Sequence, residues 1–166
     1  DKPIVLQYAI WLGKALTGDF GISIVTSRPV LAEVLPSLVN SLILAIGGAL
    51  LGFFVGILFG GLAGYFHGRP LDRIFTGMAI TGVSVPHYWL AIVLVIIFAV
   101  ELSWLPALGM NPTGSTEFNF SVDNFRHMVL PVISLSVIPA GIVTRTVRGV
   151  FAELLNQEFT EALRSK

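Results

Sequence analysis

The sequence predicts an all-α membrane protein, a polytopic helical bundle, and three observations carry this prediction. The chain of 166 residues is 54% hydrophobic and only 12% charged, with a mean hydropathy of +0.83. Three stretches, 34–68, 74–100 and 127–144, contain no Lys, Arg, Asp or Glu, and about 20 mostly apolar residues suffice to cross a bilayer core of roughly 30 Å. From Val147 onward the apolar residues recur at three- and four-residue spacing between charged ones, which indicates an amphipathic helix.

The composition argues against several classes of function. Zero net charge leaves no basic stripe to neutralise nucleic acid, and the absence of cysteine removes disulfides and thiolate chemistry. Three histidines on separate segments predict no metal site, and no glycine-rich loop ends in Lys-Ser or Lys-Thr to hold a nucleotide. No catalytic set and no cofactor are therefore predicted. Because the chain opens at Asp1 rather than at Met, and stops within a helical pattern, we expect a piece of a longer protein.

Residues 1–35 are mixed in polarity and form a lead-in to the first span. Residues 4–16 predict a short helix lying at an interface, and the Gly-Asp-Phe-Gly stretch at 18–21 predicts a turn. Pro36 suits the first turn of the next helix, where its missing N–H costs nothing.

The first span, 38–66, carries a glycine at every fourth position. Small residues at this spacing let two membrane helices approach backbone to backbone, so the row predicts helix packing. The row drifts about 40° per step on an ideal helix, too far to face a single parallel neighbour, and we therefore expect the span to lie inside a bundle and to contact more than one neighbour. Its members within the span are Gly48, Gly52, Gly56, Gly60 and Gly64.

The second span, 74–100, is interrupted by Val85-Pro86. Because proline removes a backbone hydrogen bond and clashes with the preceding turn, a break is expected near 86. Broken helices at membrane depth are tolerated where protein or a water-filled cavity covers them. The break therefore offers four pathway candidates, Ser84, Pro86, His87 and Tyr88, and the alternative is a packing kink with an internally bonded histidine. The third span covers about 128–148, and Trp104 in the loop before it fits an interfacial anchor.

Orientation follows from the basic residues near the span ends. One side, 67–73 with 145–166, concentrates Arg69, Arg73, Arg145, Arg148, Arg164 and Lys166. The positive-inside tendency puts this side, with the terminal segment 149–166, in the cytoplasm. That segment is one helix continuing from the span or a separate helix capped by Asn156. Its striped surface is shaped to contact a soluble neighbour, and its charged face includes Arg148.

Four stretches resemble one family, the integral-membrane permease subunits of bacterial ATP-binding-cassette (ABC) importers for dipeptides, oligopeptides and nickel. They are Gly-Asp-Phe-Gly at 18–21 with Arg28-Pro29-Val30, the start of the permease region at 35–45, Trp104-Leu105-Pro106 with Gly109, and Thr144-Arg145, Arg148 and 157–166. The last stretch resembles the approach to the cytoplasmic EAA loop and the first half of that loop. Where the family usually has an arginine, Glu161 inverts the charge.

The resemblance implies a type I ABC importer transmembrane domain over 36–166, with about three of six spans, in the bacterial inner membrane. It implies as partners two ATP-binding-cassette ATPase subunits, a second homologous permease and an extracytoplasmic solute-binding protein, with transport by alternating access. The residues it assigns to ATPase docking are Glu158, Phe159, Thr160, Glu161, Ala162, Leu163, Arg164 and Lys166.

Several alternatives stay open on the sequence alone. The near absence of ionisable groups from the spans disfavours a self-powered carrier, yet an ATP-independent channel or secondary carrier remains. So do a scaffold whose tail recruits a soluble partner, a membrane-embedded enzyme, and a permease for nickel or another small solute.

Overall fold

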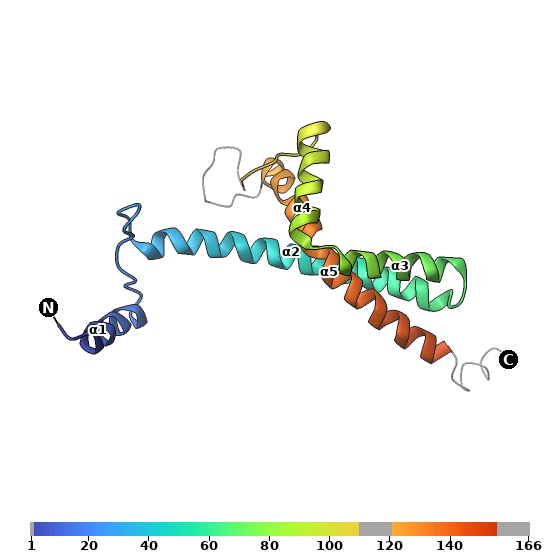
Figure 1. Cartoon of the computed structure of the whole chain (residues 1–166), viewed down its shortest axis with the longest axis horizontal. Helices are drawn as coiled ribbons and strands as arrows, with labels where there is room; N and C mark the ends of the chain where they lie inside the picture. Colours follow the sequence, from blue (N-terminus) through green and yellow to red (C-terminus); the bar gives the residue numbers. More distant parts are fainter. Residues whose placement is uncertain (1, 110–120, 156–166) are drawn as a thin grey trace.

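The computed structural model describes residues 2–109 and 121–155, and these are mostly helical (Figure 1). The elements are α1 (Ile4–Leu16), α2 (Val30–Tyr65), α3 (Pro70–Ser84), α4 (His87–Val95), the π-helical η1 (Ile96–Glu101) and α5 (Val122–Leu155). The predicted all-α membrane class is confirmed: α2 and α5 are each long and apolar enough to cross a membrane, and α3 with α4–η1 forms a bent pair. The predicted ATPase-docking residues, 158–166, lie outside the described residues.

The lead-in closes in a tight hairpin before α2. Ile22 and Pro29 form an antiparallel bridge, and the Val30 N–H donates to the Gly21 carbonyl at 3.0 Å. Gly21 adopts a φ of 78°, a left-handed conformation that glycine accepts without strain. Before this hairpin, α1 lies apart from the other helices (Figure 1), with its apolar side chains exposed as an interfacial helix requires.

Helix α2 begins earlier than the sequence suggests. Its first residue is Val30, directly after Pro29, and Pro36 lies inside the helix. The prediction that Pro36 falls in the first turn is therefore wrong. Pro29 instead caps α2, directly after the hairpin bridge that it forms with Ile22. With 36 residues, α2 is about 54 Å long and extends beyond a bilayer core of roughly 30 Å.

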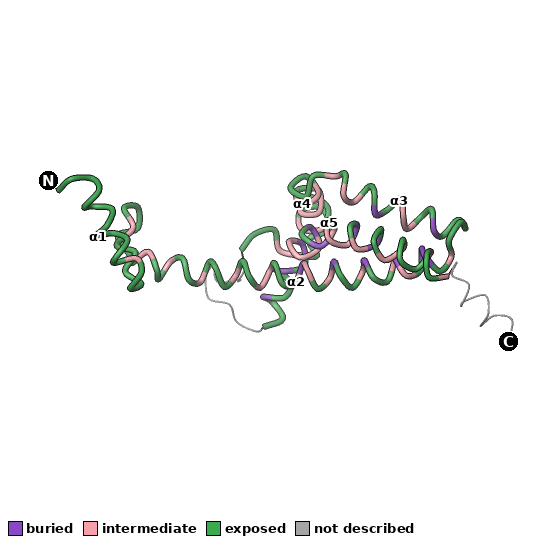
Figure 2. Tube along the Cα trace, turned by 90° about the horizontal axis from the view of Figure 1, so that it is seen from below, coloured by how far each residue is buried: buried purple, intermediate pink, exposed green. Residues whose placement is uncertain are grey.

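The glycine row of α2 lies against α5. A Cβ at Gly48 would meet Leu135, one at Gly56 would meet Val143, and one at Gly64 would meet Phe151. Partner numbers rise together by a constant offset, so α2 and α5 run parallel. The purple, buried stretches of Figure 2 gather where these helices meet. On the opposite face of α2, Phe53, Phe54 and Ile57 are more than half exposed, as a lipid-facing or subunit-facing surface would be.

The expectation that the row's drift would carry it past a single neighbour is wrong for Gly48–Gly64. The expectation that the span contacts more than one neighbour is confirmed, because α2 also contacts α3, where the Phe59 and Phe75 rings lie 4.7 Å apart. The first expectation assumed a straight parallel neighbour, whereas α5 carries Pro131 and Pro139 within the contact region, and prolines are the usual cause of helix bending. A contact row with a period of four stays on one neighbour when the two helices wind around each other in a right-handed sense.

Helix α3 returns antiparallel along α5. Gly82 faces Val137, and Gly141 faces Ala79 and Val83, so the paired numbers run in opposite directions. The chain then bends by 99° between α3 and α4. Because α5 is parallel to α2, the end of α5 and the turn between α2 and α3 lie at the same end of the bundle (Figure 1).

Candidate functional site

The bend between α3 and α4 is made by Val85 and Pro86. Val85 is extended, with φ −81° and ψ 126°, and Pro86 caps α4 with φ −59°. Proline drives the residue before it out of helical geometry, which ends α3 at Ser84. Helix α4 then starts afresh, with the Leu90 N–H donating to the Pro86 carbonyl at 3.1 Å.

The four predicted pathway residues share one exposed corner at this bend. Ser84, Pro86, His87 and Tyr88 are all at least partly exposed. The Ser84 hydroxyl donates to the Ile80 carbonyl at 2.8 Å, within its own helix. The rings of His87 and Tyr88 stand edge to face with centroids 6.3 Å apart. The corner thus presents an imidazole and a phenol away from the packed helices, while their role in a pathway stays a prediction.

The segment after η1 is bonded to the first turns of α5. The Arg126 guanidinium donates to the Trp104 carbonyl at 2.7 Å, and His127 Nδ1 lies 3.0 Å from the Leu108 carbonyl. A cavity of about 390 Å³ opens beside this link, bordered by Trp104, Asp123, Arg126 and His127 among others. The Trp-Leu-Pro motif is therefore held in place by side chains of α5.

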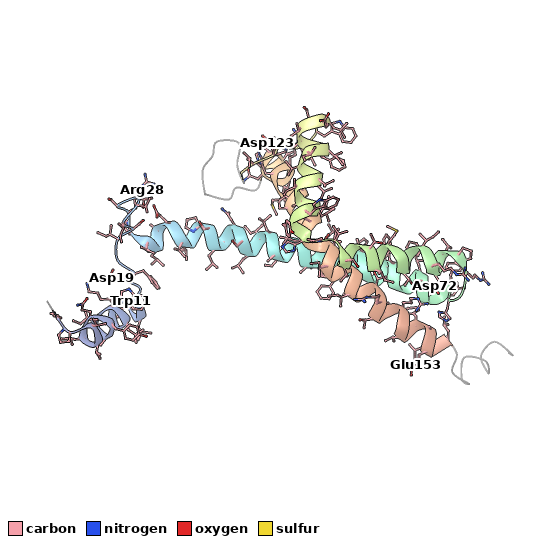
Figure 3. All side chains as sticks on the ribbon, viewed as in Figure 1. Trp11, Asp19, Arg28, Asp72, Asp123 and Glu153 are labelled. Carbon is pink, nitrogen blue, oxygen red and sulfur yellow. The ribbon has the colours of Figure 1, made fainter. Side chains whose placement is uncertain are left out.

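The most polar constellation surrounds Asp72, at the end of the bundle where α2 turns into α3 (Figure 3). One carboxylate oxygen of Asp72 accepts from Arg148 Nε and from the Thr76 hydroxyl, the latter at 3.1 Å. The other oxygen accepts from Arg148 Nη2 at 2.8 Å and from the Gly68 N–H at 3.0 Å. His67 Nδ1 lies 3.4 Å from this second oxygen.

Local sequence explains how the carboxylate reaches these donors. Gly68 has a φ of 76°, a left-handed conformation that aims its N–H at Asp72 across the turn. Asp72 itself sits in the first turn of α3, where the positive end of the helix dipole favours an anion. Arg148 reaches it from α5 with both arms of its guanidinium, the arrangement that matches a carboxylate best.

Asp72 is 3% exposed, so its charge is removed from solvent and compensated within the protein. Among the ion pairs of residues 2–109 and 121–155, Asp72–Arg148 alone joins segments far apart in the sequence. A buried charge left without its partner is strongly destabilising, by about 3–5 kcal/mol. The pair therefore holds α3 and α5 together at this end.

Sequence reasoning misses this pair. Periodicity counts Arg148 with the charged face directed at a soluble neighbour, whereas Arg148 binds within the bundle. His67 has no acid at ligand or relay spacing in the sequence, whereas in the structure it lies beside Asp72. One signal is available: a lone acid in the first turn of one span and an arginine ending another span on the same side form a natural pair.

Two parallel apolar helices, a proline-broken helix pair between them and a buried ion pair at one end define an integral membrane protein of the helical bundle class. The chain belongs to the family described as binding-protein-dependent transport system inner membrane component, whose family model matches residues 56–166. The family resemblance expected from the sequence motifs is thereby confirmed, and the multi-pass inner-membrane location with it.

Relatives with known names align over the whole chain. It is 33% identical to the oligopeptide transport system permease protein AppB of Bacillus subtilis (strain 168). It is 30% identical to the dipeptide transport system permease protein DppB of Alkalihalophilus pseudofirmus and to the glutathione transport system permease protein GsiC of Escherichia coli (strain K12). The chain covers 52%, 55% and 50% of these proteins, so it spans about half the length of the relatives it matches.

Proposed function

We propose that the intact protein is the permease subunit of an ATP-driven importer and that it lines, with a second homologous permease, the pathway for dipeptides or oligopeptides. The observation that carries this proposal is the family match over residues 56–166. The names of the three relatives, for oligopeptide, dipeptide and glutathione transport, support peptides as the solute class. The family's binding-protein dependence supports an extracytoplasmic solute-binding protein as a further partner.

Coupling to the ATPase is proposed to occur at the end of the bundle that holds Asp72. Helix α5 leaves the bundle there and is continuous as far as Leu155. Residues 156–166 follow directly, and basic residues concentrate at this end, which favours the cytoplasmic side. In this proposal Phe159, Ala162 and Leu163 fill an apolar groove of the ATPase. The rim of the contact is formed by Glu158, Glu161, Arg164 and Lys166.

Solute passage is proposed to involve the exposed corner at the bend. Ser84, His87 and Tyr88 offer hydroxyl and imidazole groups that could exchange hydrogen bonds with a peptide backbone. Backbone breaks at membrane depth are stable where they line a water-filled cavity, and the second permease subunit would complete such a cavity around this corner.

The test is ATP-dependent peptide uptake by the intact protein, reconstituted in vesicles with its ATPase, permease and binding-protein partners. Phe159→Asp places a charge in the proposed groove. We expect uptake to fall by at least about tenfold, the loss typical of a buried interface anchor, while the membrane bundle stays folded. Glu153→Gln is the matched control, because Glu153 is exposed on the last described turn of α5 and should tolerate the change.

Two outcomes would contradict the proposal. Uptake by the unmodified complex that proceeds equally without ATP would favour a channel or secondary carrier. Full uptake by the Phe159→Asp complex would show that residues 158–166 do not form the ATPase contact.

A further inference from the structure

The Asp72–Arg148 pair completes a line of contact between α3 and α5. Three points define this line: Gly82 against Val137, Gly141 against Ala79, and Asp72 against Arg148. Ala79 follows Asp72 by seven residues and Arg148 follows Gly141 by seven, so both helices advance by two turns between these points. The three contacts therefore lie along one side of α3.

The three points differ in kind. The two nearer the bend are apolar and very close: a Cβ on Gly141 would stand 2.7 Å from the Ala79 carbonyl oxygen. Such contacts resist compression but not lateral sliding, because dispersion attraction has no strong direction. The Asp72–Arg148 contact is a two-armed charge-assisted hydrogen bond in a buried place, and such bonds are strong and orientation-dependent. It is the point that resists rotation of α3 against α5.

The position of the pair is equally specific. Arg148 is seven residues, about 10 Å of helix, before Leu155, the last residue of α5 that the structure describes. Asp72 is at the start of α3, whose other end, about 20 Å away, meets the bend at Val85. The same carboxylate also binds the Gly68 N–H, in the turn that ends α2. One buried group thus joins α3, α5 and the turn after α2, at the end of the bundle toward which α5 runs.

We propose that Asp72 and Arg148 are positioning residues that transmit movement of the segment after α5 to α3 and so to the bend at Val85–Pro86. The inference rests on the proposed function, in which that segment contacts the ATPase. When the Asp72–Arg148 ion pair is formed, α3 is held to α5 at both ends, and the two helices move as one rigid body. With the pair removed, α3 keeps its contact with α5 near Ala79–Val83 and the ring contact of Phe75 with Phe59 of α2, but its first turn is no longer held to α5.

The experiment measures peptide uptake and ATP hydrolysis on the same reconstituted full complex and compares their ratio. Asp72→Asn is nearly isosteric: its single oxygen can still accept from the Gly68 N–H, and its NH2 group can donate to the Thr76 hydroxyl. It loses the charge and one of the two acceptors that hold Arg148. We expect the complex to hydrolyse ATP while uptake per ATP falls about fivefold or more, the range of ordinary coupling between sites. Arg148→Lys keeps the charge without the two-armed geometry and should fall between Asp72→Asn and the unmodified protein.

The matched control is Arg145→Gln. Arg145 lies one turn before Arg148 on α5, is exposed, and makes no ion pair within the residues that the structure describes. The substitution removes the same charge from the same helix and should leave uptake per ATP unchanged.

The ratio separates transmission from simple stabilisation. A pair that only stabilises the fold would lower the amount of active complex, so that uptake and hydrolysis fall together and the ratio stays constant; this result would overturn the inference. If Asp72→Asn does not assemble, Arg148→Lys decides by the same ratio. Failure of the unmodified complex to import peptide would count against the proposed function, whereas normal import with unchanged ratios in both variants would defeat this inference alone.

Discussion

The α2–α5 contact is so close that one added methyl group should disturb it. A Cβ at Gly56 would stand 2.6 Å from the Val143 Cβ and 2.9 Å from the Ala140 carbonyl oxygen. Ordinary contact begins at 3.4 Å, so the helices would have to part by about 0.8 Å. Neither neighbouring atom is the tip of a flexible side chain. Gly56→Ala should therefore carry the cost of overpacking, about 1–3 kcal/mol.

A second effect opposes this cost. Alanine is favoured over glycine within a helix by about 1 kcal/mol, so the net destabilisation by Gly56→Ala should reach up to about 2 kcal/mol. Gly77→Ala isolates the opposing effect, because Gly77 is helical and a Cβ there meets nothing within 4 Å. Gly47→Ala is intermediate, since its closest contact is the Val132 Cγ2 at 3.1 Å, an atom that a small rotation can displace.

The assay is the midpoint of thermal unfolding of the purified intact protein in lipid nanodiscs, compared across the three alanine variants. We expect Gly77→Ala to unfold at or above the temperature of the unmodified protein, Gly47→Ala near it, and Gly56→Ala clearly below it. A Gly56→Ala protein as stable as Gly77→Ala would refute the reasoning, because the two helices could not then be in backbone contact at this position.

Two further predictions concern the bend and the turn before α3. On a background without other cysteines, Ser84→Cys should react with a polar maleimide in the assembled complex, because Ser84 lies at the corner beside the proposed pathway. Ala63→Cys is the control and should not react, since Ala63 is 0% exposed. If both thiols were equally protected, the corner would not line an aqueous path. Gly68→Ala should lower the unfolding midpoint, since a φ of 76° costs a side-chain-bearing residue about 1–2 kcal/mol. Gly13→Ala, where a Cβ meets nothing within 4 Å, is its control, and equal midpoints for the two would contradict the left-handed turn.

Two parts of the fold follow from the sequence: the membrane class, which depends on lipid as the solvent, and the bend, which depends on the local effect of a proline. The uncharged stretches are long because lipid cannot solvate charge, so the membrane class follows from composition and its distribution along the chain. The bend is a local effect of Pro86 on Val85. The proline rule predicts a break near 86, and α3 ends at Ser84.

What the sequence misses are the relations between segments. The glycine row shows that α2 has a close partner, but it cannot show that this partner is a single proline-bearing helix that stays on the row from Gly48 to Gly64. A proline marks a helix start at either Pro29 or Pro36, and only the hairpin bridge at Pro29 decides that α2 starts directly after Pro29. In both cases the local sequence allows more than one structure, and contacts between segments decide which one forms.

The Asp72–Arg148 pair shows the same limit at the level of a single site. Arg148 fits the charged face of an amphipathic helix by periodicity, and nothing in its own helix indicates otherwise. The decisive fact is that α3 runs antiparallel to α5 while the glycine row holds α2 parallel to it. These two directions bring the turn at Gly68 beside the last turns of α5, so that a carboxylate in the first turn of α3 meets the arginine. Because of this topology, Arg148, which periodicity assigns to a surface for an outside partner, instead binds Asp72 and joins α5 to α3 and to the turn after α2.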